Sequence, residues 1–363
     1  MDKGPSYCFS VEWYDQYAHT VRKFLLLYNE KTKSVEMHDQ KFNRVFLKPT
    51  KIDDLKLSNL YPGSSVTILS RTLRIVDFAD NFTRNTLGAN VEKYVVFVRA
   101  GSICRSGKTL EALENEGFKL VNLKMVCLNS DEVRKISEEN MNVSKIPHLL
   151  TEVSEKLILA LELMGKGVRN RIIEMIGNGP LDAERGFVMN SDLLAIAAST
   201  ESAACQSEQI FGYPGGPHFM GLPRLKGTTC AVIKPHAVTD GLTGKILDAI
   251  QSKGFCITAA RLFRLSKHDA AEFLEVYKGV AHEYPEMLEH LASGPCVALE
   301  IASIREGEDV QQTFREFVGP VDPEVARFLR PDTLRARFGV DKVCNAIHCT
   351  DLPNDTELEV SKK

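Results

Sequence analysis

The sequence predicts an α+β multidomain protein, in which a small β-rich unit precedes two related α/β domains. The chain has 363 residues, which at about 100–200 residues per domain corresponds to two or three domains. Residues 1–92 contain short apolar runs separated by turn signals, and the remainder contains an internal repeat. With 44 % hydrophobic and 26 % charged residues, the composition is that of a folded globular chain and excludes wholesale disorder.

Charge and hydropathy exclude several classes of function. The net charge is −3, from 45 basic and 48 acidic side chains, so no basic excess drives binding to nucleic acid or to an anionic membrane. No apolar run approaches the ~18–20 residues that cross a bilayer, and residues 1–7 do not resemble a secretory signal. The nine cysteines form no CxxC pair. We therefore expect reduced thiols in a cytoplasmic compartment.

The N-terminal 92 residues are interpreted as one β domain. Short apolar or alternating runs predict strands at Phe24–Tyr28, Arg44–Leu47, Ser65–Leu69 and Leu73–Val76. Turn signals separate them at residues 29–31, 48–50 and 62–64. Several short strands at this spacing are typical of a small barrel or sandwich.

The rest of the chain contains two copies of one pattern. Gly107–Phe118 matches Gly244–Phe255 at an offset of 137 residues, and each copy lies between two strand-like runs. A strand, a helix ending in Gly-Phe, a second strand, further helices and a third strand form the split βαβ pattern of ferredoxin-like domains. We expect these domains at residues 93–205 and 226–363, joined by a Gly/Pro-rich linker at 206–225.

Four motifs follow one another in the second copy. They are Lys234-Pro235-His236-Ala237, Ser293-Gly294-Pro295, Thr333-Leu334-Arg335 and Asn345-Ala346-Ile347-His348-Cys349-Thr350-Asp351. In this order and over about 115 residues, they make residues 226–360 resemble the nucleoside diphosphate kinase family. That family moves the γ-phosphate of a nucleoside triphosphate to a nucleoside diphosphate through a phosphohistidine.

The resemblance implies a role for each matching residue. His348 corresponds to the nucleophile, which splits one difficult transfer into two easier ones. Glu359 corresponds to the carboxylate that orients the imidazole. Phosphoryl transfer depends mainly on positioning and electrostatics. The resemblance accordingly implies that nucleotide is bound by Lys234, Arg315, Arg335, Asn345 and Tyr284, with Mg²⁺ held by the phosphates of ATP or another triphosphate rather than by the protein.

The second copy also departs from the family pattern. Val321 stands where the family has a threonine that contacts phosphate, and Leu352 stands where it has a serine. The tyrosine that clamps the nucleotide falls near Leu274. A lost polar contact to a charged phosphate costs about 1–3 kcal/mol, so these departures imply a slow enzyme.

The first copy lacks the charged residues that the second copy shares with the family. Lys-Pro becomes Arg99-Ala100, the position of the first arginine falls at about Ile173, and the nucleophile position falls at Met189. Methionine cannot carry a phosphoryl group, so this copy is interpreted as a degenerate scaffold. A phosphate-binding loop at Gly107-Lys108-Thr109 is rejected, because Ser102 occupies the place of the required glycine.

Residues 1–92 resemble a DM-ten domain, which has a PH-like β fold, in Glu12-Trp13-Tyr14-Asp15, residues 35–39 and Phe46-Leu47-Lys48. The order of domains, a DM-ten domain followed by two kinase modules, resembles that of a family member found with axonemal and centrosomal microtubules. The resemblance implies a location in the flagellar or ciliary axoneme or basal body, with tubulin and microtubule-associated proteins as partners. The alternative is a purely structural scaffold with an inactive kinase site. Because two unequal copies could use the family's assembly surfaces on each other, we expect a monomer within a larger assembly.

Overall fold

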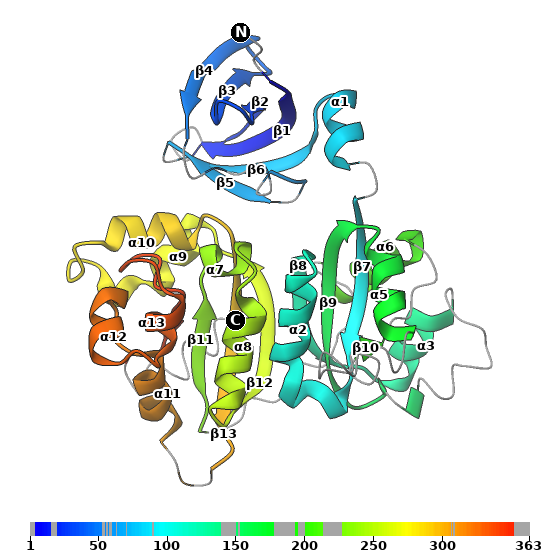
Figure 1. The fold of residues 1–363 in the computed structure, drawn as a ribbon, viewed down its shortest axis with the longest axis vertical. Coiled ribbons are helices and arrows are strands. Elements are labelled where there is room, and N and C mark those ends of the chain that lie inside the picture. The colour runs from blue at the N-terminus through cyan, green and yellow to red at the C-terminus, as the bar shows by residue number, and fades with distance from the viewer. Residues whose placement is uncertain are drawn as a thin grey trace.

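The structure is a computed structural model, drawn in Figure 1. It describes residues 4–351 except for the segments named here. Outside the described part lie residues 1–3, 16–19, 53–54, 56, 58–59, 63, 70, 89–90, 139–149, 152, 178–192, 195–199, 213–226, 306, 308 and 352–363.

The N-terminal unit is a six-stranded antiparallel sheet. Its strands are β1 (Ser6–Asp15), β2 (Thr20–Asn29), β3 (Ser34–Asp39), β4 (Arg44–Lys51), β5 (Ser65–Ile68) and β6 (Arg71–Phe78), in the order β4-β3-β2-β1-β6-β5. Alternate residues of β2 and β3 face a shared core that includes Phe9, Phe24 and Met37. This alternation is the period of a sheet with one buried face. A short helix α1 (Asn81–Thr83) and a π-helical turn (Arg84–Gly88) lead out of the sheet.

Each of the four predicted strands overlaps a strand of this sheet, but one predicted turn is wrong. Residues 48–50 lie inside β4, which continues to Lys51. β4 is at the edge of the sheet, where Pro49 is tolerated because its missing N–H is not required by a second neighbour. The register of β3 and β4 shifts in the same region, between Val35 and Met37. The strands β1 and β3 were not predicted from the sequence.

The remaining strands form one eight-stranded sheet in the order β10-β7-β9-β8-β12-β13-β11-β14. The first half consists of β7 (Val91–Val98), a 3₁₀ turn (Ala100–Arg105), α2 (Ser106–Asn115), β8 (Lys119–Cys127), α3 (Ser130–Glu138), β9 (Leu157–Lys166), α5 (Val168–Gly177), β10 (Leu193–Leu194) and α6 (Thr200–Phe211). Because α6 runs to Phe211 and packs on β7, residues 206–211 belong to a helix and not to the predicted linker. The rest of that linker is outside the described residues, apart from Gly212.

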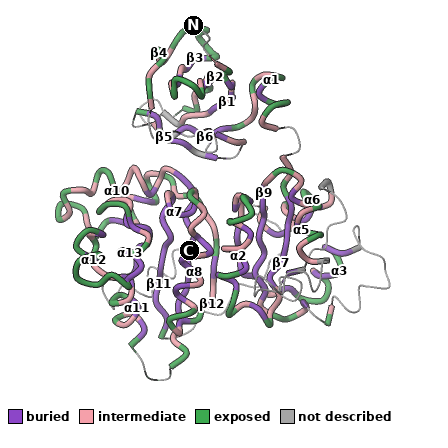
Figure 2. The backbone as a smooth tube through the Cα atoms, viewed as in Figure 1, coloured by how far each residue is buried: buried purple, intermediate pink, exposed green. Residues whose placement is uncertain are grey.

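The second half repeats the succession with longer connections. It consists of β11 (Thr229–Ile233), α7 (Pro235–Thr239), α8 (Thr243–Ser252), β12 (Phe255–Arg264), α9 (Lys267–Phe273), a 3₁₀ turn (Glu275–Tyr277), α10 (Tyr284–Leu291), β13 (Pro295–Ser303), α11 (Val310–Val318), α12 (Pro323–Leu329), α13 (Leu334–Phe338) and β14 (Ile347–Cys349). The central strands β9, β11 and β13 are almost entirely buried, as Figure 2 shows for β9 and β11. None of the described helices is long and apolar enough to span a membrane.

The two halves meet through equivalent elements. β8 pairs with β12 at Lys124 and Arg261, two positions that differ by the repeat offset. Beside them α2 packs against α8, where Gly107 and Gly244 let the two helix backbones touch. The buried core runs continuously across this junction, from Leu110 and Leu113 to Ile246 and Ile250.

Candidate active site

The strand that carries His348 is short and lies at one edge of the large sheet. β14 pairs with β11 so that His348 lies opposite Val232 and Ile347 opposite Ile233. His348 is 5 % exposed. Because β11 is buried along its length, this pairing fixes the imidazole at the point where β11 ends.

The approach to β14 is a strained turn lined by aromatic rings. Ala346 has φ 68°, which is unfavourable for a residue with a Cβ, and Ile347 N–H donates to the carbonyl of Asn345 across it (2.9 Å). The His348 ring is met edge-on by Phe273 (centroids 4.9 Å apart) and Tyr277 (6.4 Å). Neither aromatic residue was singled out by the sequence analysis.

Arg335 ties two loops of the site together. Its guanidinium Nε donates to the carbonyl of Ile347 (3.1 Å), and a terminal nitrogen donates to the carbonyl of Gly319 (2.9 Å). The residue lies on α13 and is 5 % exposed. A buried arginine with backbone acceptors on two segments holds them in register while keeping a positive charge beside β14.

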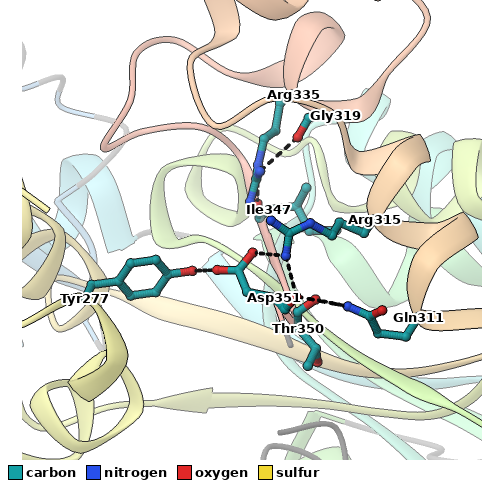
Figure 3. Close-up of polar contacts among 8 residues, drawn as sticks. All are labelled: Tyr277, Gln311, Arg315, Gly319, Arg335, Ile347, Thr350 and Asp351. Atoms are coloured by element: carbon teal, nitrogen blue, oxygen red, sulfur yellow. Dashed lines mark hydrogen bonds and ion pairs between the residues drawn. The ribbon is translucent and has the colours of Figure 1, made fainter. Parts of the chain in front are cut away.

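Arg315 is bonded to Asp351, the last residue of the His348 motif. It forms an ion pair with the Asp351 carboxylate (2.6 Å) and donates to the Asp351 carbonyl (2.5 Å). Tyr277 donates its hydroxyl to the same carboxylate from the opposite side (Figure 3), and burial together with Asp351 raises the pKa of that phenol. Gln311 donates to the carbonyls of Thr350 (2.9 Å) and Asp351 (3.2 Å). The segment after His348 is thus anchored by α11 and by the 3₁₀ turn at Glu275–Tyr277.

Lys234 directly follows β11 and is the N-cap residue of α7. Its N–H donates to the carbonyl of Ala346 (2.8 Å), and its Nζ donates to the carbonyl of Val343 (2.9 Å). Burial, and secondly the positive charge of Arg335, lower the pKa of this amine to about 7. A buried amine of this kind gains its proton most readily when an anion enters the site.

Asn345 is buried at the start of the His348 motif. Its Nδ2 donates to the carbonyl of Val321 (3.1 Å), whereas its Oδ1 has no hydrogen-bond partner among the described residues. A buried carbonyl oxygen left in this state is costly unless a ligand donates to it.

Not every predicted site residue lies in this group. Tyr284 begins α10 and packs on the same apolar cluster as Phe273 and Tyr277, and the ring edges that meet His348 are those of Phe273 and Tyr277. Leu274 is a core residue, 3 % exposed. Glu359 and Leu352 lie outside the described residues.

The first half carries no nucleophile at the matching strand position. β10 pairs with β7 so that Leu193 lies opposite Val98, the last residue of β7, and Leu194 lies opposite Phe97. In the second half, Ile347 and His348 hold the same register against β11. The strand register therefore assigns the position of His348 to Leu194 and not to Met189, which is outside the described residues. A leucine is as unable as a methionine to accept a phosphoryl group.

Comparisons with known proteins agree with the geometry of the second half. The sequence profile described as "Nucleoside diphosphate kinase" matches residues 227–362. The "Nucleoside diphosphate kinase" of Aquifex aeolicus (strain VF5) is 40 % identical over 132 residues, covering 36 % of this chain and 89 % of the relative. A crystal structure of the Aquifex aeolicus nucleoside diphosphate kinase covers 37 % of this chain and 92 % of that chain, at 39 % identity and a TM-score of 0.35. The profile match and the 40 % identity show that the second half is a domain of the nucleoside diphosphate kinase class.

One comparison extends over nearly the whole chain. "Nucleoside diphosphate kinase homolog 7" of Rattus norvegicus is 38 % identical over 370 residues, covering 99 % of this chain and 93 % of the relative. The chain belongs to the nucleoside diphosphate kinase homolog 7 family.

Proposed function

We propose that the chain is a nucleoside diphosphate kinase whose second half transfers the γ-phosphate of ATP or another nucleoside triphosphate to a nucleoside diphosphate through His348. The observation that supports this most is the convergence of Lys234, from the end of β11, and Arg335, from α13, on the segment that leads into His348. A structural role for His348 alone would not require two buried cations beside it.

The reaction divides into two displacements. A ring nitrogen of neutral His348 attacks the γ-phosphorus, the bond from that phosphorus to the β–γ bridging oxygen breaks, and the diphosphate leaves with the bond electrons. A terminal oxygen of the acceptor diphosphate then attacks the same phosphorus, and the phosphorus–nitrogen bond breaks to restore the imidazole. The charge of the transferring group is spread over its oxygens, so Lys234, Arg335 and Arg315 stabilise it electrostatically.

The donor set around β14 suits phosphate oxygens. Three cationic side chains supply it, and the Asp351 carboxylate is already bonded to Arg315 and Tyr277. Mg²⁺ would therefore be held by the outer phosphates of the nucleotide, whose charge it would neutralise. The unsatisfied Oδ1 of Asn345 suits a hydroxyl donor such as that of the sugar.

The test is formation and transfer of an acid-labile phosphate. Full-length protein is incubated with γ-labelled ATP and Mg²⁺ beside His348→Ala and beside His268→Ala, a control whose side chain is 88 % exposed. We expect label on the wild type and on the control, transfer of that label to GDP, and none on His348→Ala. Unlabelled, folded wild-type protein would overturn the proposal, as would label that persists in His348→Ala.

We propose further that the chain works within a microtubule-based assembly, in the axoneme or basal body of a flagellum or cilium. The support is the resemblance of residues 1–92 to a DM-ten domain, followed by two kinase-like units of which the first is degenerate. Tubulin and neighbouring microtubule-associated proteins would be the partners. We also propose that the chain is monomeric before assembly, because α2–α8 and β8–β12 already use equivalent surfaces on each other.

A scaffold without activity is the second candidate function. It is favoured by one observation, the engagement of the Arg315 guanidinium by both the carboxylate and the carbonyl of Asp351. Co-sedimentation of the full chain with taxane-stabilised microtubules tests the assembly role, and His348→Ala separates it from catalysis. Equal sedimentation of both proteins with no label on either supports the scaffold; label on wild type with no sedimentation leaves the enzyme and removes the microtubule role.

A further inference from the structure

Three side chains with metal-binding atoms meet beside the end of β11. His236 lies on α7, His290 lies in the last turn of α10, and Cys344 lies in the loop before β14. One donor atom from each lies within 4.8 Å of the others. His236 Nδ1 and His290 Nε2 are 2.9 Å apart, and Cys344 Sγ is 3.9 Å from His290 Nδ1.

Hydrogen bonding within the group is incomplete. His236 Nε2 is buried and has no hydrogen-bond partner among the described residues. The two rings are tilted by 44° with centroids 5.0 Å apart, so they share one short nitrogen–nitrogen contact and do not stack. A buried imidazole nitrogen without a partner costs free energy, and an ion bound at His236 Nε2 would remove that cost.

The donor chemistry selects the class of ion. Two imidazoles and one thiol are the ligands of Zn²⁺ and related borderline metals, whereas Mg²⁺ and Ca²⁺ take oxygen ligands. Neutral imidazole is the form of histidine that binds a metal ion, and each ring does so through one nitrogen. A tetrahedral ion with ligand bonds of about 2.0–2.3 Å would use one nitrogen of each ring, so the three donor atoms, which lie within 4.8 Å of one another, would turn toward a common centre.

The loop and the charges around these three side chains also favour a bound cation. The Asp341 carboxylate accepts the N–H groups of Val343 (2.8 Å) and Cys344 (2.6 Å), which fixes the loop and places a negative charge nearby. Asp240 adds a second negative charge near His236 and Cys344, and the Lys234 amine opposes them. We propose that His236, His290 and Cys344 form a binding site for a Zn²⁺-class divalent metal ion, with a fourth position left for water or another ligand.

Such an ion would join three segments of the second half. It would fasten the loop that contains Val343, Cys344 and Asn345 to α7 and α10, and that loop carries the acceptor of the Lys234 amine. The proposal concerns binding of the ion and stands whether or not His348 is phosphorylated. We therefore expect metal binding to raise the melting temperature of the protein.

The experiment uses the full chain, reduced and freed of metal, and titrates it with Co²⁺ as a spectroscopic substitute for Zn²⁺. We expect one equivalent to produce the near-ultraviolet band of a thiolate bonded to cobalt, and Zn²⁺ to abolish that band. Cys344→Ser is expected to remove it, and His290→Gln to weaken binding at least tenfold. Cys256→Ser and His268→Gln are matched controls at exposed positions and should bind as the wild type does.

Two results would overturn the proposal: absence of the band in the wild type, or a band that survives in Cys344→Ser. Thermal melting without metal shows whether each variant folds. Should His290→Gln fail to fold, Cys344→Ser decides alone, because serine for cysteine is close to isosteric at this half-buried position.

Discussion

Gly107 and Gly244 each lie against the backbone of the helix that carries the other. A Cβ on Gly107 would stand 2.1 Å from the amide nitrogen of Asp248, and a Cβ on Gly244 would stand 2.1 Å from that of Glu111. The hydrogen bonds are reciprocal too: Gln251 Oε1 accepts the Gly107 N–H (2.9 Å), and Glu114 Oε2 accepts the Gly244 N–H (2.8 Å). Each pair is related by the repeat offset, so α2 and α8 are related by an approximate two-fold axis.

Substitution of either glycine should therefore separate the two halves. Gly107→Ala or Gly244→Ala places a methyl group against backbone that cannot move aside, and we expect a loss of about 3 kcal/mol or more in the free energy of unfolding. Urea unfolding followed by circular dichroism measures it. Gly101→Ala is the control, because nothing lies within 4 Å of its added Cβ. Losses of similar size in all three variants would contradict the backbone contact.

Glu114 lies at the same contact between α2 and α8, and its titration should make the free energy of unfolding depend on pH. Burial against α8 raises the pKa of this carboxyl to about 7, and its Oε1 has no hydrogen-bond partner among the described residues. The folded state then binds more protons than the unfolded state between about pH 4.5 and 7, so the stability it contributes is present below that range and is lost as the pH rises through it. The full loss, above pH 7, is about 3 kcal/mol.

Glu114→Gln should remove that dependence, because the equivalent residue on α8 is already Gln251, which accepts from Gly107 and donates to the Ile103 carbonyl (2.7 Å). Urea unfolding of both proteins at pH 5 and pH 8 is the measurement. We expect the variant to be the more stable at pH 8 and the difference to shrink at pH 5. Parallel pH profiles would show that Glu114 titrates normally.

Much of the fold could be predicted because its signals are local. The strand-like runs that precede the two repeat copies, residues 94–98 and 229–233, lie in β7 and β11. The helix predicted in the second copy, from Gly244, corresponds to α8. Gly117 (φ 84°) and Gly254 (φ 97°) follow the two helices in the left-handed conformation that glycine adopts readily, which is why both copies read Gly-Phe.

The site was predictable only in part. Lys234, Arg335 and Asn345 stand in short motifs, and the structure brings them together at β14. Phe273 and Tyr277 could not be singled out, because aromatic residues at helical spacing are usually core. The position that corresponds to His348 in the first half was predicted at Met189 and is assigned by the structure to Leu194. The two differ because strand register depends on pairing across the sheet and not on spacing along the chain.

We expect Arg335 to contribute both to the free energy of unfolding and to the rate of phosphoryl transfer. Arg335→Lys keeps the charge but cannot reach the carbonyls of Ile347 and Gly319 together. We expect a loss of about 1.5–3 kcal/mol in unfolding free energy, the range for a charged donor removed from a buried acceptor, and a slower labelling of His348. Arg330→Lys, at an exposed position, should change neither. If Arg335→Lys unfolds like the wild type, the two carbonyl bonds do not hold the loops.

The last prediction concerns Val321, whose side chain is exposed while its carbonyl accepts from Asn345. The family resemblance implies a phosphate-contacting threonine here, and Val321→Thr restores the hydroxyl at almost the same volume. A hydrogen bond to a charged phosphate contributes about 1.5–3 kcal/mol, so we expect His348 to be labelled about tenfold faster or more. Rapid-quench measurement of phosphohistidine formation provides the rate, and Val45→Thr, at an exposed position on β4 of the N-terminal sheet, is the control. An equal rate in Val321→Thr and wild type would mean that the phosphates pass this position beyond the reach of a hydroxyl.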